Sequence, residues 1–133
     1  MIKKLLYKNM PKSYQNQINN LSKYSTDLQA IYKIDPTILF IIYLSQNEII
    51  GYLAYKDFDI SYDIYNIVID PQYQRQQIGQ QLLSNIFDKK IVLEVKEGNQ
   101  GAINFYQKNN FKIVNIKPKY YKDGQNAIVM VRN

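Results

Sequence analysis

The stretch from Ile67 to Leu83 reads IVIDPQYQRQQIGQQLL. It begins with three β-branched apolar residues, which are typical of a buried strand. Pro71 follows almost at once and favours a turn. From there the apolar residues recur on one helical face, at Ile78, Leu82, Leu83, Ile86 and Phe87. The stretch therefore predicts a strand, a turn and an amphipathic helix in immediate succession.

This succession predicts a candidate anion site. A helix that begins directly after a strand leaves its first amide groups without helical partners, and these groups attract phosphate. Gly79 has no Cβ, so the backbone could approach an anion closely, and Arg75 could add a charged donor. A plainer interpretation stays open, in which Gly79 only makes room for packing and the turn binds nothing.

The rest of the chain predicts further strands and helices on both sides of this stretch. Upstream we expect three strands besides the one that ends in it, and a helical segment with apolar residues at Ile18, Leu21, Leu28 and Ile31. Downstream we expect a strand, a helix and a hairpin. The expected strands are Ile2–Tyr7, Ile38–Leu44, Ile49–Tyr55, Tyr62–Asp70, Ile91–Val95, Phe111–Ile116 and Ala127–Val131, and the last helix is Asn99–Asn110. This order predicts one α/β domain over residues 1–133.

Composition limits the possible chemistry. The chain of 133 residues contains no cysteine and no histidine. Disulfide frameworks, zinc–thiolate sites, cysteine nucleophiles and Ser-His-Asp triads are thereby excluded. Any reaction must use carboxylates, tyrosines, lysines, hydroxyl groups and backbone amides, and we expect no metal.

The net charge of +6 has two interpretations. A basic surface attracts nucleic acid or a polyphosphate, whereas scattered lysines also follow from compositional bias. The lysines are scattered here, so we expect no direct nucleic-acid partner. The longest apolar run, Ile38–Leu44, is far too short to span a bilayer, and the first residues make a poor signal peptide. The expectation is a cytoplasmic protein without a membrane partner.

The stretch around Gly79 resembles the acetyl-CoA motif of the GNAT superfamily, Gln/Arg-x-x-Gly-x-Gly/Ala. Gln74 matches its first position and Gly79 its last, while Gln77 stands where the family usually has glycine. The resemblance implies the GNAT acyl-CoA N-acyltransferase fold, a central mixed, mostly antiparallel sheet flanked by about four helices. It also implies that acetyl-CoA is bound by Ile67, Val68, Ile69, Gln74, Arg75, Gln76, Gln77, Ile78, Gly79, Gln80 and Asn99.

A second segment, Leu93–Phe111, is similar to RimI-type acetyltransferases, which modify protein N-termini. The matching residues are Glu94, Asn99, Ala102, Tyr106 and Phe111. Asn110 replaces the glycine that usually precedes the phenylalanine, and asparagine tolerates the left-handed conformation almost as well.

The end of the chain resembles the same enzymes. Tyr120 and Tyr121 match their paired tyrosines, and Ala127 and Met130 match the closing Ala-x-x-Met. The resemblance implies that the two tyrosines contact the acceptor. The chain departs from the pattern in having no tryptophan and in carrying Gln125-Asn126 in place of an acidic pair.

Each candidate catalytic residue also has a structural interpretation. Glu94 in an apolar strand either pairs with a lysine or, with its pKa raised by burial, acts as a general base. Tyr106 either packs in the core or protonates the leaving thiolate. Asn99 fits a helix N-cap, which is compatible with cofactor contact.

The resemblance implies direct transfer of an acetyl group, in a ternary complex, from acetyl-CoA to a primary amine. The leading hypothesis for the acceptor is a protein N-terminal α-amine, as in the ribosomal-protein alanine acetyltransferases. A small-molecule amine such as a polyamine or an antibiotic is the alternative. A non-catalytic CoA- or nucleic-acid-binding module is a further one, and a homodimer is possible.

Overall fold

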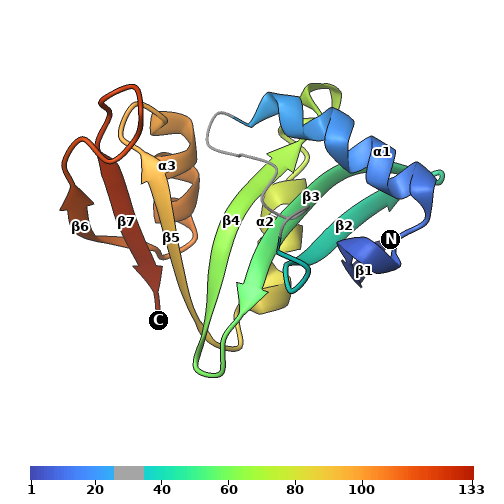
Figure 1. The fold of residues 1–133 in the computed structure, drawn as a ribbon, viewed down its shortest axis with the longest axis horizontal. Coiled ribbons are helices and arrows are strands. Elements are labelled where there is room, and N and C mark those ends of the chain that lie inside the picture. The colour runs from blue at the N-terminus through green and yellow to red at the C-terminus, as the bar shows by residue number, and fades with distance from the viewer. Residues whose placement is uncertain (26–34) are drawn as a thin grey trace.

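The computed structural model describes residues 1–25 and 35–133, and in this part of the chain one sheet of seven strands is flanked by three α-helices (Figure 1). The strand order is β1-β2-β3-β4-β5-β7-β6. All described neighbours are antiparallel except β4 and β5, so the expected mixed, mostly antiparallel sheet is confirmed. The strands are β1 Ile2–Leu6, β2 Leu39–Ser45, β3 Glu48–Asp57, β4 Ser61–Ile69, β5 Lys90–Lys96, β6 Lys112–Lys117 and β7 Ala127–Arg132, and the helices are α1 Lys12–Leu21, α2 Ile78–Leu83 and α3 Gln100–Lys108.

Helix α2 is shorter than the apolar spacing predicted. Helix α2 ends at Leu83 and continues only as a 3-10 turn over Ser84–Ile86. The side chains of Ser84 and Asn85 both donate hydrogen bonds to the carbonyl of Gln81, and such local bonds compete with regular helix. Leu28 and Ile31, which the spacing placed in the first helix, lie outside the described residues. No helix within 1–25 and 35–133 is long and apolar enough to cross a membrane.

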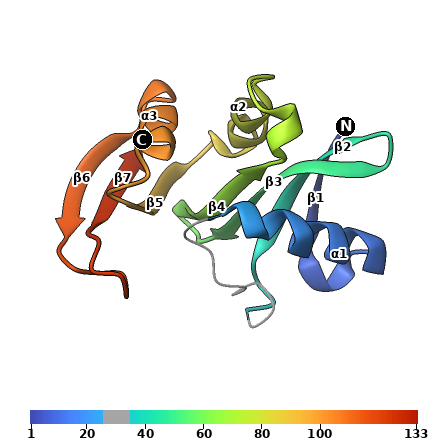
Figure 2. The same ribbon diagram turned by 90° about the horizontal axis from the view of Figure 1, so that it is seen from above.

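The helices cover opposite faces of the sheet, with α1 on one face and α2 and α3 on the other (Figure 2). Each face has its own apolar core. The α1 face buries Ile18 and Leu21 against β2, β3 and β4. The other face buries Leu82 and Leu83 of α2 and Ile103 of α3 against β3, β4, β5 and β7. The sheet is therefore held in place by apolar contacts on both sides.

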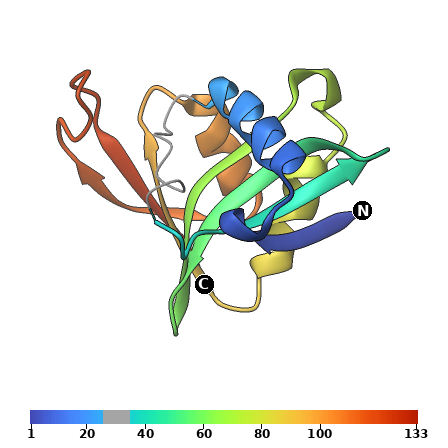
Figure 3. The ribbon, with the colours of Figure 1, turned by 45° about the vertical axis from the view of Figure 1, so that its right-hand side comes forward.

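The sheet opens between β4 and β5, which are the only parallel neighbours in the described part of the chain. They pair over Ser61–Ile64 and Lys90–Leu93 and then diverge, so that the ribbon forms a V (Figure 1). The part of the sheet made of β5, β7 and β6 turns away from the rest (Figure 3). Beyond Ile64, β4 pairs with β3 alone among the strands in 1–25 and 35–133. Its other edge presents main-chain groups to the open side of the V.

A bulge lies in β4 where the V opens. Ala54 pairs with Asn66 and Tyr55 with Ile64, so Tyr65 has no partner residue on β3. An extra residue of this kind bends a strand and increases its twist. Because one residue is inserted, the side chains after the bulge point to the opposite face from the one that strict alternation would give. Ile64 and Ile67 both pack on the α2 face, although they are three positions apart.

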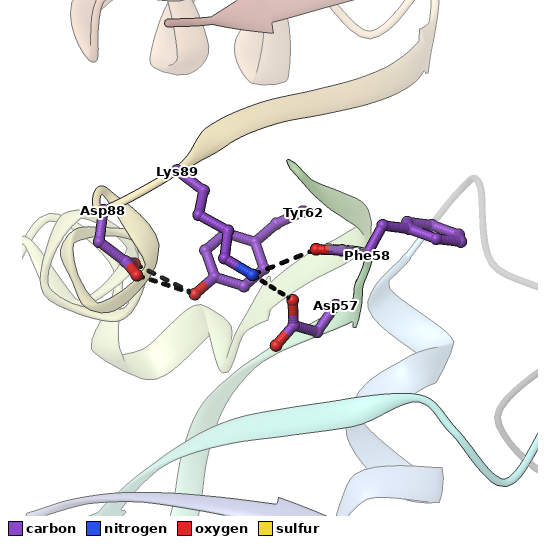
Figure 4. A network of polar contacts seen from close by, with 5 residues as sticks. All are labelled: Asp57, Phe58, Tyr62, Asp88 and Lys89. Atoms are coloured by element: carbon purple, nitrogen blue, oxygen red, sulfur yellow. Dashed lines mark hydrogen bonds and ion pairs between the residues drawn. The ribbon is translucent and has the colours of Figure 1, made fainter. Parts of the chain in front are cut away.

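A polar clamp closes the narrow end of the V (Figure 4). The hydroxyl of Tyr62 on β4 donates to both carboxylate oxygens of Asp88, at 3.1 Å each. Lys89, which precedes β5, donates to Asp57 Oδ1 at 2.7 Å and to the carbonyl of Phe58 at 3.1 Å. Its ammonium also lies 4.8 Å from the centroid of the Tyr62 ring. The clamp joins the β3–β4 hairpin to the start of β5.

Replacing Tyr62 by phenylalanine tests this clamp. The substitution keeps the buried ring and removes a hydroxyl bonded to a carboxylate, so we expect the free energy of unfolding to fall by about 1.5–3 kcal/mol. Urea denaturation measures the change. Tyr24→Phe is the control, because Tyr24 is 49% exposed. Equal stability of the two variants would contradict a clamp that contributes to the fold.

Candidate active site

A cavity of about 180 Å³ lies in the opening between β4 and β5. We call it the notch. It brings together residues of both strands and of α3, among them the carboxylate of Glu94 and the phenol of Tyr106. Its lining from these elements and their connection is Ile64, Tyr65, Asn66, Ile67, Leu93, Glu94, Val95, Asn99, Ala102 and Tyr106. Four of the residues that the sequence singled out, Ile67, Glu94, Asn99 and Tyr106, therefore share one cavity.

Glu94 lies on the face of β5 that points away from the α2–α3 core. Its neighbours Leu93 and Val95 are buried in that core, while 31% of the Glu94 side chain is exposed. Lys117 Nζ lies 2.6 Å from Glu94 Oε1. The lysine partner that the sequence left as an alternative is thus present, and the carboxylate is half-buried and ion-paired.

Asp63 is a second carboxylate beside Glu94, and sequence reasoning missed it. Both residues line a cleft of about 320 Å³, the outer cleft, whose other lining residues are Ile64, Tyr65, Val92, Leu93, Tyr120 and Tyr121. Burial, and then the negative charge of Glu94, raise the pKa of Asp63. The signal was available, because Asp63 is a charged residue inside a predicted strand, as Glu94 is.

Tyr106 and Asn99 are positioned by α3. Tyr106 is 6% exposed and its ring packs between those of Phe105 and Phe111, at centroid distances of 5.3 and 5.2 Å. Asn99 Oδ1 accepts a hydrogen bond from the amide of Ala102 at 3.2 Å, which confirms the predicted N-cap. After α3, Asn110 adopts a φ of 70°, the left-handed conformation that its glycine-like position indicated.

The loop between β4 and α2 borders a larger cavity of about 490 Å³, the loop cavity. Two residues of this loop, Arg75 and Gln77, have positive φ values, 66° and 59°. Such left-handed residues cost about 1–2 kcal/mol each unless they are glycine. The lining comprises Ile69, Tyr73, Gln74, Arg75, Gln77, Ile78, Gly79, Gln80, Phe105, Lys108 and Asn109.

Gly79 has a packing role in this cavity. A Cβ at Gly79 would lie 3.3 Å from two ring atoms of Phe105, so the glycine lets α2 and α3 approach closely. Gly79 therefore has the packing role that the sequence left open, and it lies in the wall of the candidate anion site.

Two of the predicted cofactor-binding residues direct their side chains elsewhere. Val68 is 4% exposed and lies in the α1-side core. Gln76 is exposed and lines neither the notch nor the loop cavity. Any contact that Val68 makes in the open V must come from its backbone. Tyr120 and Tyr121 lie apart from the loop cavity, in the outer cleft, with ring centroids 5.2 Å apart.

Comparison with known proteins places the chain among acetyltransferases. Residues 36–113 match the acetyltransferase (GNAT) domain family. Ribosomal protein bS18-alanine N-acetyltransferase of Escherichia coli (strain K12) is 36% identical over 77 residues, which cover 50% of this chain and 52% of that protein. N-alpha-acetyltransferase RimI of Mycobacterium tuberculosis is 32% identical over 77 residues, 54% of this chain and 49% of that protein. The chain thus spans about half the length of these relatives.

Solved structures agree in fold. The crystal structure of the ribosomal-protein-S18-alanine N-acetyltransferase from Escherichia coli superposes with a TM-score of 0.78 at 21% identity, covering 98% of this chain and 92% of that one. A GNAT family acetyltransferase from Elizabethkingia anophelis with acetyl-CoA bound gives a TM-score of 0.78 at 23% identity, covering 99% and 97%. This likeness confirms the fold that the resemblance implied.

The left-handed loop residue Gln77 provides a test of local strain. Gln77→Gly removes the steric cost of the side chain but adds flexibility to the unfolded chain, so we expect the free energy of unfolding to change by less than about 1 kcal/mol. Gln77→Val places a β-branched residue at positive φ, and we expect it to destabilise by more than 1 kcal/mol, roughly. Urea denaturation measures both.

The same pair of substitutions at Gln76, whose φ is not positive, serves as the control. There the order should reverse, with glycine no better than valine. If valine were tolerated at position 77 as well as glycine, the left-handed conformation would be wrong.

Proposed function

The chain belongs to the GNAT acetyltransferase family, and we propose that it transfers an acetyl group from acetyl-CoA to a protein N-terminal α-amine. The observation that carries the proposal is the notch. Glu94 of β5, Tyr106 of α3 and the part of β4 that has left its ladder with β5 line one cavity there. These are the groups that acyl transfer to an amine requires in a chain without histidine or cysteine.

The residues around the loop cavity fit the acetyl donor. Arg75 and Lys108 supply positive charge, and the first amides of α2 lie in the same wall. Because α2 has only six residues, these amides and cations, rather than a long helix dipole, account for anion binding. Ile69 lines the loop cavity and Ile67 the notch, so an extended donor can follow β4 from one to the other.

The side chains of the notch then have distinct roles. Bound acetyl-CoA supplies the acetyl group as a thioester. Glu94 takes a proton from the acceptor ammonium, directly or through water. The main-chain groups of β4 beside Ile67 orient the donor and stabilise charge that develops on its carbonyl oxygen. Tyr106 donates its hydroxyl proton to the sulfur that leaves.

The acceptor is proposed from two considerations. The matched relatives from Escherichia coli and Mycobacterium tuberculosis are named for action on ribosomal protein bS18-alanine and on N-alpha-amines. In addition, an α-amine has a pKa of about 7.7–8.0 and a lysine side chain of about 10.4, so a single carboxylate base suits the α-amine better. The paired rings of Tyr120 and Tyr121 in the outer cleft would contact the first residues of the acceptor.

A small cationic amine is the second candidate acceptor. Asp63 and Glu94 place two carboxylates in the outer cleft, and such a pair favours a ligand with more than one positive charge. A polyamine meets this description without requiring a peptide groove.

Donor binding can be tested at Gly79. Valine at this position presses on the Phe105 ring, and overpacking of this kind costs about 1–3 kcal/mol. We expect Gly79→Val to weaken acetyl-CoA binding about tenfold or more, as measured by calorimetry. Gly101→Val is the matched control, because a Cβ at Gly101 meets nothing within 4 Å. Equal losses in the two variants would contradict the assignment of the loop cavity.

Catalysis can be tested at Glu94 and Tyr106. We expect Glu94→Gln and Tyr106→Phe each to lower kcat/KM by about 10²-fold or more, with unchanged affinity for acetyl-CoA. The assay uses a peptide with N-terminal alanine, a peptide with a blocked N-terminus and an internal lysine, and spermidine. Glu97→Gln is the control, since Glu97 is exposed and bonds to Asn126.

The choice of acceptor decides between the two candidates. Turnover of the alanine peptide alone supports the proposal, and turnover of spermidine alone favours the small amine. Binding of acetyl-CoA with no turnover of any amine would overturn catalysis.

A further inference from the structure

An ammonium group of the chain itself already lies against Glu94 on the side of the outer cleft. Lys117, at the end of β6, places Nζ 2.6 Å from Glu94 Oε1 and 5.1 Å from the centroid of the Tyr120 ring. A carboxylate and an aromatic face are the two kinds of group with which proteins hold cationic amines. Lys117 therefore occupies the position that an acceptor ammonium needs if Glu94 is to take its proton.

Another cation can displace Lys117 from its contact with Glu94. The side chains of Lys117 and Glu94 are 42% and 31% exposed, and ion pairs at such exposure contribute little stability. The hydrogen bond to Glu94, and then its charge, raise the pKa of Lys117, so the lysine stays charged. While this pair persists, Lys117 competes with any other amine that approaches Glu94 Oε1.

We propose that Lys117 competes with the acceptor amine for Glu94, so that the acceptor ammonium must displace the lysine before transfer. The inference rests on the proposed function, in which Glu94 takes the acceptor's proton. Asp63, whose charge also interacts with Lys56, lines the outer cleft together with Glu94, so an entering ammonium can contact a second carboxylate during the exchange. The acceptors that fit are amines that arrive protonated and bring no carboxylate of their own into the cleft.

The chain offers a matched control for this exchange. Lys96 lies 5.2 Å from the centroid of the Tyr121 ring, much as Lys117 lies by Tyr120, but its ammonium pairs with Asp123 at 3.3 Å and not with Glu94. Substitutions of Lys96 therefore alter a lysine–tyrosine contact next to the cleft without altering the charge on Glu94.

Steady-state kinetics with the alanine peptide test the competition. We expect Lys117→Met to lower KM for the peptide about three- to fivefold, the range for a partly exposed ion pair, with kcat changed less than about twofold. Lys117→Arg keeps the charge and should behave like the unmodified protein, as should Lys96→Met. A raised or unchanged KM in Lys117→Met would overturn the proposal.

A second measurement does not depend on turnover. In protein labelled with 13C-lysine and without acetyl-CoA, the Lys117 signal is identified by its loss in Lys117→Arg. We expect added alanine peptide to shift this signal and to lower the pKa of Lys117 towards its ordinary value, while the Lys96 signal stays in place. An unchanged Lys117 signal at the highest peptide concentration would overturn the exchange. If no amine is acetylated, the proposed function fails, and the Lys117 signal still decides whether amines compete with it.

Discussion

Strands β4 and β5 share a ladder over only four residues each, Ser61–Ile64 and Lys90–Leu93, and the notch of the candidate site depends on this early separation. Backbone groups that lose their strand partner must find another partner or water. Two features keep the separation in place. The clamp of Tyr62, Asp88 and Lys89 joins the strands at the closed end, and the bulge at Tyr65 bends β4 where they part.

Charged side chains and strained backbone conformations lie around this opening. Two left-handed residues, Arg75 and Gln77, shape the loop beside the larger cavity, and unfavourable backbone conformations of this kind are concentrated at functional sites. Across the V, Asp63 and Glu94 share the outer cleft, and Glu94 is paired with Lys117. Arg75 and Lys108 thus line the loop cavity beyond the end of β4, and Asp63 and Glu94 line the outer cleft near its start.

Much of this arrangement could be predicted from the chain, and the exceptions have physical causes. Helix α2 was predicted too long because apolar spacing does not register the side-chain bonds of Ser84 and Asn85 that end it. Glu94 and Tyr106 were found through their resemblance to a family, whereas Asp63 was overlooked although it carried the same local signal. The ion pair of Glu94 with Lys117 spans 23 residues of sequence, and no local pattern specifies which of many lysines approaches a carboxylate.

The sequence by itself determined the strand–turn–helix unit, the cap at Asn99 and the absence of histidine and cysteine chemistry, because these depend on composition and on spacing within a few residues. Only the tertiary structure decided that Gly79 packs against Phe105, that Asp63 joins Glu94, and that Lys117 pairs with Glu94. These contacts arise where strands and helices far apart in the chain meet. Their geometry depends on how far β4 and β5 diverge, which short-range patterns do not encode.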